Sequence, residues 1–222
     1  PIYKIASFEI TDIELIKYTA SKGKPIIMST GVASYEDIEL AVKTCRNVGN
    51  NDITLLKCTS SYPATIEEAN LIMMNQFAKD FDVNVGLSDH TLGITLPIVA
   101  TTMGAKVIEK HFIINKSIGG PDSTFSLDKE EFSEMVKSVR EAEKSIGNNS
   151  YKLTQKQKLG KQFTRSLYVS KDIKKGEVFT EKNIKSVRPG FGLHPKYYNL
   201  ILGKKSKKKL SFGDRLKKEY FD

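Results

Sequence analysis

The stretch VNVGLSDHTLGITLPIVATTMGAKVIEKHF, residues 83–112, places two β-rich runs, Val83–Ser88 and Lys106–Phe112, on either side of a helical stretch. Two strands joined by a helix pair in parallel, because the helix carries the chain back to the edge at which the first strand began. His90 follows the first run closely, and His111 lies near the end of the second. The stretch therefore predicts a parallel α/β unit with polar side chains at the carboxyl ends of its strands.

The same alternation extends over residues 1–147, with a strand–helix unit about every 22–31 residues. Five strands are predicted, at Ile2–Ser7, Pro25–Ser29, Ile53–Ser60, Val83–Ser88 and Lys106–Phe112. A closed barrel of this type has eight strands in about 250 residues, whereas an open doubly wound sheet is complete with five. Because the chain starts at Pro1 and enters a strand at once, we expect either an open five-stranded sheet or a barrel whose first strands are absent.

Capping patterns predict where several helices begin. The pairs are Thr11 with Glu14, Ser34 with Asp37, and Thr65 with Glu68. After Asp128, apolar residues recur at spacings of three and four, namely Phe132, Met135, Val136, Val139 and Ile146. This spacing predicts an amphipathic helix.

The pattern changes at the polar segment GNNS, residues 147–150. Beyond a lysine-rich bridge, short β-like pieces at Ser166–Val169 and Glu177–Thr180 are separated by turns that contain glycine. We therefore predict two domains, the strand–helix domain at residues 1–150 and a small, mainly β domain at residues 160–222.

Charge divides the chain at the same place. Residues 151–222 contain 20 Lys and Arg against 6 Asp and Glu, a net charge of +14, whereas residues 1–150 contain 15 against 20, or −5. The run KKSKKK, residues 204–209, would suit nucleic acid. Neither an aromatic RNA-binding signature nor a zinc motif accompanies it, so we interpret it as a solvated surface and expect no nucleic-acid partner.

Composition indicates an ordinary globular protein, with 39% hydrophobic and 27% charged residues. No apolar run approaches the roughly 20 residues that a membrane-spanning helix needs, and the first residues, PIYKIASFEI, do not resemble a secretory signal. The two cysteines, Cys45 and Cys58, are too few for a disulfide framework. We therefore expect a cytoplasmic protein with no membrane partner.

Hydroxyl groups and lysine gather at the predicted strand ends. In parallel α/β folds these ends converge on one face, where ligands bind. The polar side chains there are Lys4, Ser7, Ser29, Ser60 and Ser88, with glycines nearby at Gly31 and Gly86. Such a set suits an anion with several oxygens, such as phosphate or carboxylate. A single serine would more simply begin a turn, but four serines at successive strand ends favour a binding site.

His90 and His111 lie 21 residues apart in sequence, at the mouths of neighbouring strands. Neutral imidazole is the commonest metal ligand. With oxygens from substrate and water, two imidazoles would suit an octahedral divalent ion, Mn²⁺ or Mg²⁺, and Asp89 or Glu109 would be placed to orient a ring. The alternative is a hydrogen-bonded pair without metal. His194 is expected to be a loop residue.

Three further residues flank the strand ends. Asp122 lies in a Gly-Gly-Pro loop after the last strand, and Glu9 and Tyr62 follow earlier strands. Loops at this face commonly contact substrate. An Asp in such a loop would serve a turn equally well.

Lys57 lies inside an apolar strand, ITLLKCTS. A lysine in such a place can have a lowered pKa and form a Schiff base. The favoured interpretation is an ion pair with a neighbouring carboxylate such as Glu109.

Six segments, in this order and spacing, resemble the sialic (nonulosonic) acid synthase family, and within it the pseudaminic acid branch. They are YKIAS, KPIIMSTG, LLKCTSSYPA, VGLSDHTLGI, AKVIEKHF and GGPDSTFSL. The later segment KDIKKGEVFTEKNIKSVRPGFGL is similar to the antifreeze-like SAF (β-clip) domain. The resemblance implies a TIM barrel of which this chain begins at about the fourth strand and holds strands four to eight. The first three strands, with a glutamate that the family uses, would then be absent.

The resemblance also implies a reaction, the condensation of phosphoenolpyruvate with an open-chain N-acylated amino sugar, which releases phosphate. Lys4, Ser7, Ser29, Ser60 and Ser88 would bind phosphoenolpyruvate, and His90 and His111 would ligate the metal. Tyr62 and Asp122 would face the sugar, and Arg188 would reach the partner's site in a domain-swapped homodimer. Ser60 is the least secure of these, because the sialic acid branch has Asn at its position.

Two other functions remain open. One is a Schiff-base aldolase that uses Lys57 and pyruvate, and the other is an inactive fragment of the synthase, since the first strands would be needed for a complete site.

Overall fold

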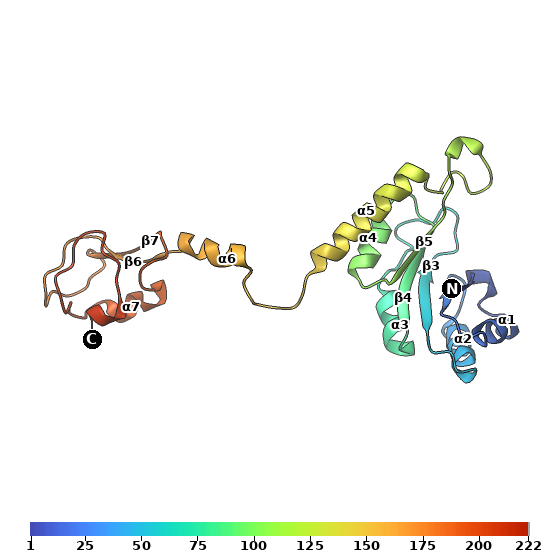
Figure 1. Cartoon of the computed structure of the whole chain (residues 1–222), viewed down its shortest axis with the longest axis horizontal. Helices are drawn as coiled ribbons and strands as arrows, with labels where there is room; N and C mark the ends of the chain where they lie inside the picture. Colours follow the sequence, from blue (N-terminus) through green and yellow to red (C-terminus); the bar gives the residue numbers. More distant parts are fainter. Residues whose placement is uncertain (222) are drawn as a thin grey trace. The chain divides into compact units, whose positions relative to one another are not determined.

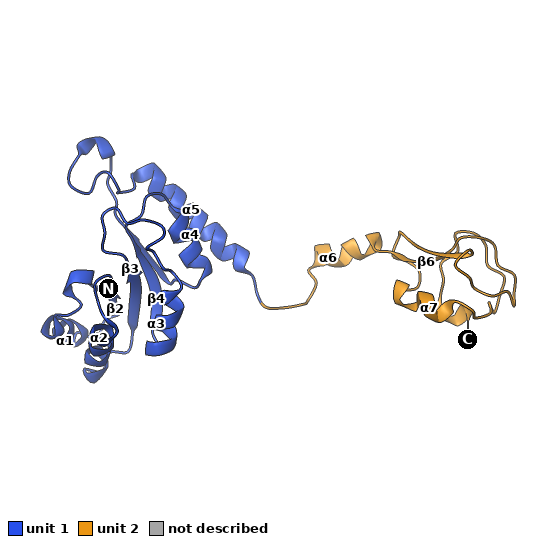
Figure 2. Ribbon diagram, turned by 180° about the vertical axis from the view of Figure 1, so that it is seen from behind, with its two compact units in different colours: residues 1–148 blue, residues 149–222 orange. Residues whose placement is uncertain are grey.

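The computed structural model describes residues 1–221, which form two compact units (Figure 2). Unit 1 comprises residues 1–148 and unit 2 begins at residue 149. Each unit has its own cluster of buried apolar side chains, as expected of independently packed domains.

Unit 1 contains one parallel sheet of five strands, which confirms the predicted pairing (Figure 1). The strands are β1 (Tyr3–Ile5), β2 (Ile26–Ser29), β3 (Ile53–Cys58), β4 (Asn84–Asp89) and β5 (Val107–Lys110). Their order in the sheet is their order in the chain. A doubly wound sheet reverses direction at a switch point, and this sheet does not. The strands therefore form part of a barrel, and the alternative of an open doubly wound sheet is wrong.

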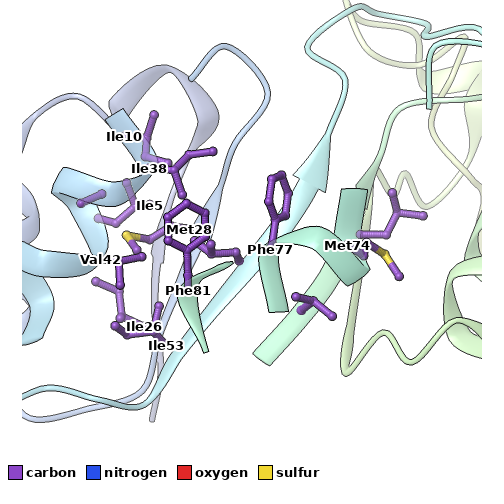
Figure 3. Packing of buried hydrophobic residues seen from close by; sticks show 14 of the residues in the cluster. Ile5, Ile10, Ile26, Met28, Ile38, Val42, Ile53, Met74, Phe77 and Phe81 are labelled. Carbon is purple, nitrogen blue, oxygen red and sulfur yellow. The ribbon is translucent and has the colours of Figure 1, made fainter. Parts of the chain in front are cut away.

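The helices pack against one face of the sheet. They are α1 (Ile13–Ala20), α2 (Tyr35–Asn47), α3 (Met73–Phe81), α4 (Thr95–Thr102) and α5 (Lys129–Ile146). Alternate strand residues, such as Ile26, Met28 and Ile53, join helix residues such as Val42 and Phe81 in the main core (Figure 3). Because side chains alternate along a strand, the residues between them point to the opposite face, which is the inner face of the barrel.

The helix starts follow the capping prediction in part. Ser34 and Asp128 cap α2 and α5, each with a reciprocal bond from the residue three positions on. The box at Ser34 was predicted from the sequence, whereas the box at Asp128 was not. At α1 the cap is Asp12 instead of Thr11, since the Asp12 carboxylate accepts the N–H of Leu15.

The helix predicted after Thr65 does not form. Residues 65–72 are turns and irregular chain, and α3 begins only at Met73. The capping pattern around Thr65 is a local signal, and here it lies in the long connection between β3 and α3.

The amphipathic helix α5 lies beside α4 (Figure 1). Of its predicted apolar face, Met135 is buried, whereas Val136 and Ile146 are 44% and 55% exposed. The apolar face of α5 is therefore only partly covered by the described part of the chain.

Unit 2 contains a two-stranded antiparallel sheet, β6 (Ser166–Val169) with β7 (Ile184–Val187). The β-like piece predicted at Glu177–Thr180 is confirmed in part. Val178 forms an isolated antiparallel bridge with Lys205, and the Phe179 N–H donates to the Lys204 carbonyl, but no regular strand forms. The Phe179 side chain is fully buried. Short helices complete the unit, α6 (Gln155–Gly160) and α7 (Tyr198–Ile201), with further isolated bridges between loops. None of the helices in residues 1–221 has the length and apolar character required to cross a membrane.

Candidate active site

Two imidazoles lie together at the carboxyl ends of β4 and β5. His90 and His111 are the residues directly after these strands, and their neighbours Asp89 and Lys110 pair in register. The ring centroids are 5.2 Å apart in an edge-to-face arrangement. The structure thus brings together the two histidines that the sequence singles out.

Backbone and side-chain acceptors orient the two rings. His90 Nδ1 is 2.8 Å from the carbonyl oxygen of Thr59, so Nδ1–H donates to it, and in the neutral ring Nε2 keeps the lone pair. His111 Nδ1 is 3.5 Å from a carboxylate oxygen of Asp122. This is the arrangement that metal-binding histidines use to fix their tautomer.

The two carboxylates that were predicted to orient the rings, Asp89 and Glu109, contact other residues. Asp89 points to the helix side of the sheet and pairs with Lys110 at 2.6 Å. Glu109 lies on the inner face and contacts Lys4 at 3.3 Å and Ser88 Oγ at 3.1 Å. The prediction that Asp89 or Glu109 orients an imidazole is therefore wrong.

Aromatic rings enclose the histidines. The Tyr62 ring centroid lies 4.3 Å from that of His90 and 5.8 Å from that of His111. Phe125 lies 5.0 Å from His111 and is 5% exposed. Sequence reasoning missed Phe125, although it lies in the GGPDSTFSL segment that drew attention to Asp122. These rings make one wall of the site apolar.

The serine hydroxyls form a second group beside the rings. Ser7 Oγ and Ser60 Oγ share a hydrogen bond of 2.8 Å. Cys58 Sγ lies 3.7 Å from Ser60 Oγ and 4.0 Å from His90 Nδ1, so it joins the hydroxyls to the rings. Cys58 is a second site residue that sequence reasoning missed, and its place on the inner face follows from the alternation of β3.

Ser29 is the most unusual of the hydroxyls. Its side chain is 1% exposed, and its Oγ has no hydrogen-bond partner among the described residues. A buried hydroxyl without a partner costs free energy, so Ser29 is suited to bind an oxygen that enters the site.

Gly31 leaves room for the hydroxyl group. A Cβ at this position would lie 2.1 Å from Ser60 Oγ and 3.0 Å from Cys58 Sγ. The absence of a side chain at Gly31 therefore leaves space for Ser60 and Cys58, and a close approach of its backbone to a ligand stays a prediction.

Lys57 lies on the other face of the sheet. Its Nζ donates to the Cys58 carbonyl at 2.8 Å and to Thr59 Oγ1 at 3.4 Å. The favoured ion pair with Glu109 is wrong, because Glu109 belongs to the inner face and contacts Lys4. A Schiff base on Lys57 would form away from the two histidines, which disfavours the aldolase.

The surroundings shift the pKa of several site residues. Burial alone would lower the pKa of His90, but hydrogen bonds with Cys58 and Thr59 raise it above its ordinary value. Burial lowers the pKa of His111, and the adjacent His90 adds to this effect. Burial raises the pKa of Tyr62, so its hydroxyl keeps its proton and can donate.

A cavity of about 210 Å³ opens next to His111, lined also by Gly120, Asp122 and Ser126. The Asp122 side chain is 60% exposed, so its carboxylate can contact a ligand as well as His111. Glu9 instead accepts the backbone N–H of Ala6 and serves a local turn. Arg188 and His194 belong to unit 2, so the predicted role of Arg188 stays a prediction.

Two imidazoles are the metal ligands that this face offers. Residues 1–221 contain no group of three or more His, Cys, Asp or Glu side chains placed to hold a metal ion. The free Nε2 of His90 and the closeness of the rings nevertheless fit a divalent ion, provided that substrate or water supplies the remaining oxygen ligands.

Comparison with known proteins gives two family matches. The model described as "NeuB family" matches residues 1–151, and the model described as "SAF domain" matches residues 164–219. Both agree with the resemblance stated from the sequence motifs.

Individual proteins agree with the family matches. The chain is 49% identical over 219 residues, 99% of its length, to pseudaminic acid synthase of Campylobacter jejuni strain 81-176, and 51% identical over 94% of its length to that of Helicobacter pylori. It spans 64% and 62% of the length of these relatives. The solved spore coat polysaccharide biosynthesis protein SpsE of Bacillus subtilis matches 97% of this chain, and 66% of its own, at 34% identity and a TM-score of 0.62.

Proposed function

The chain belongs to the NeuB family, and from this premise we propose that it condenses phosphoenolpyruvate with an open-chain N-acylated amino sugar. C3 of the enolpyruvate would bond to the sugar aldehyde carbon, water would add at C2, and phosphate would leave, so that the product would be a nonulosonic acid of the pseudaminic acid type. The observation that carries the proposal is the pair of imidazoles, 5.2 Å apart, next to the buried hydroxyls at the strand ends. The names of two similar relatives, both pseudaminic acid synthases, support the choice of product.

Phosphoenolpyruvate would bind to the hydroxyls and to Lys4. The unpartnered Ser29 Oγ and the linked hydroxyls of Ser7 and Ser60 offer donors to phosphate and carboxylate oxygens. Lys4, now 3.3 Å from Glu109, would supply the positive charge. Ser88 Oγ donates to Glu109 and would turn to the ligand. Fixing both ends of a three-carbon acid in this way favours reaction mainly through orientation.

The sugar would bind in the cavity next to His111, with Asp122 and Tyr62 facing it. A divalent ion, Mn²⁺ or Mg²⁺, held by His90 and His111 would polarise the sugar aldehyde and make its carbon electrophilic toward C3 of the enolpyruvate. Asp122 accepts hydrogen bonds from sugar hydroxyls because its carboxylate is exposed. The Tyr62 hydroxyl stays protonated and donates. Phe125 keeps water away from the wall of the site.

We also propose that Arg188 completes the site in trans within a domain-swapped homodimer. A guanidinium makes fixed bidentate contacts with a carboxylate or phosphate, which lysine does not. The net charge of +14 in residues 151–222 would attract the anionic substrate.

The test measures phosphate release by the full-length protein with phosphoenolpyruvate, an N-acylated amino sugar and Mn²⁺. We expect activity to disappear with EDTA and in the His111→Ala variant, and to persist in His194→Ala. Ser29→Ala should raise KM for phosphoenolpyruvate more than it lowers kcat. Turnover that EDTA and His111→Ala leave unchanged would overturn the proposal.

A further inference from the structure

A second cavity, of about 310 Å³, lies mainly on the helix side of β3, although Gly31 and Cys58 of the hydroxyl group also line it. Residues of α2 and α3 line it, including Tyr35, Met73, Phe77 and Phe81, and Lys57 lines it from the strand. The Tyr35 and Phe81 rings lie 5.2 Å apart and form an aromatic wall. A cavity of this volume with apolar walls and few polar groups is typical of a small-molecule site.

Lys57 is the positively charged group of this cavity. Its Nζ donates only to uncharged oxygens, the Cys58 carbonyl and Thr59 Oγ1. Within residues 1–221 no carboxylate forms an ion pair with it. Burial lowers the pKa of Lys57, because the ammonium has lost part of its hydration.

We propose that this cavity binds a small organic monoanion, a carboxylate attached to an aromatic or other apolar body. The carboxylate would contact Lys57, and the body would lie against Met73, Phe77 and Phe81. A carboxylate would give the half-buried ammonium a favourable charge interaction in place of the hydration that it has partly lost. Neither the charge nor the apolar walls alone would select this class, but together they do.

Asp80 restricts the choice further. It is the carboxylate in the described lining, it is exposed, and its Oδ1 accepts a hydrogen bond of 2.6 Å from Gln76. Its negative charge disfavours dianions such as phosphate esters, whereas a monoanion that turns its apolar end toward Asp80 avoids the repulsion.

The cavity is linked to the histidine site through the end of β3. Lys57 holds Thr59 Oγ1, while the carbonyl of the same Thr59 accepts from His90 Nδ1. A bound anion that draws the ammonium away from Thr59 would therefore alter the support of the His90 ring. The binding inference itself does not depend on the proposed synthase activity.

The experiment uses the full 222-residue chain labelled at its methionine methyl groups with ¹³C, and the probe is benzoate. We expect a saturable shift of the Met73 methyl signal and none for Met135, which lines a different cavity. Benzamide, the neutral isostere, should bind at least about tenfold more weakly, because a hydrogen bond between two charged groups is stronger than one to a neutral amide.

Three variants test whether the charge of Lys57 binds the carboxylate of benzoate. Lys57→Met should weaken benzoate binding at least about tenfold, whereas Lys57→Arg should retain it. Lys79→Met removes an exposed charge on α3 outside the cavity and should leave binding unchanged. Equal shifts with benzoate and benzamide, or no shift of Met73 with benzoate, would overturn the proposal. The comparison of benzoate with benzamide uses the unaltered chain, so it tests the proposal even where Lys57→Met fails to fold.

Discussion

The carboxylate of Asp89 and the ammonium of Lys110 lie 2.6 Å apart, and each side chain is only 1% exposed. Each is the direct chain neighbour of a histidine of the site, Asp89 of His90 and Lys110 of His111. Thr91 also donates its N–H and hydroxyl to Asp89 and accepts from Lys110. The ion pair therefore ties the ends of β4 and β5 together behind the two imidazoles.

Lys110→Met should destabilise unit 1 by about 3–5 kcal/mol, because it leaves the Asp89 charge buried and unpaired. Lys43→Met, which breaks the exposed pair with Glu39 at 3.0 Å, should cost less than about 1 kcal/mol. Hydrogen exchange of the β4 and β5 amides in denaturant measures both losses. Equal losses in the two variants would show that burial does not strengthen the pair.

Gly31→Ala should disturb the hydroxyl group of the site. The new Cβ would lie 2.1 Å from Ser60 Oγ, so Ser60 must rotate and lose its hydrogen bond to Ser7. We expect a stability loss of up to about 1–3 kcal/mol and weaker binding of phosphoenolpyruvate, measured by calorimetry. Gly160→Ala is the control, because no atom lies near its Cβ position. Unchanged affinity in Gly31→Ala would argue against a role for Ser60.

The two thiols should differ in reactivity. Burial raises the pKa of Cys45 to about 11, so at pH 8 about one molecule in a thousand is the reactive thiolate. Burial alone would also raise the pKa of Cys58, but hydrogen bonds with His90 and Ser60 lower it. Iodoacetamide should therefore label Cys58 before Cys45, as read by peptide mass spectrometry. Faster labelling of Cys45 would contradict this.

The Cys45 thiol also makes the stability of the folded chain depend on pH. In the unfolded chain it ionises near its ordinary pKa of 9.0, and in the folded chain near 11. The folded state therefore holds the proton more tightly, and this contribution to stability is complete below pH 9 and is lost as the pH rises through 11. Cys45→Ala should reduce the loss of stability between these values, measured by denaturant unfolding.

The imidazole pair should bind Mn²⁺ in the chain. His90→Ala and His111→Ala should each weaken binding at least about tenfold, since even the loss of a group that only orients a ligand costs about 10–100-fold. Electron paramagnetic resonance of free Mn²⁺ measures the affinity. His194→Ala should change nothing, because its Nδ1 only accepts the N–H of Lys196 in unit 2. Equal affinity in all three variants would exclude His90 and His111 as ligands.

Much of unit 1 was predictable because it depends on local patterns. β-Rich runs and the helices between them predict the parallel order, and the strand ends predict that His90 and His111 meet. The cap at Ser34 is predicted for the same reason, since the capping box involves only neighbouring residues.

The faces of the strands were harder to predict. Lys57 on the helix side and Cys58 on the inner face are consecutive residues, so an uncertainty of one residue in the position of β3 exchanges their roles. The expected pair of Lys57 with Glu109 failed for this reason. Phe125 was missed because its contact with His111 joins a loop to a strand end, and no local pattern encodes such a contact.

The alternation of β5 limits how this protein can change over time. Substitutions at Ile108 and Lys110 adjust the outer layer, while those at Glu109 and His111 adjust the chemistry, so the two sets can vary separately. Insertion or deletion of one residue within β5 would exchange the two faces of the strand. The imidazole of His111 would then point toward the helices, and the ammonium of Lys110 would point to the inner face of the barrel. Length variation is therefore expected in the connecting segments and not within the strands.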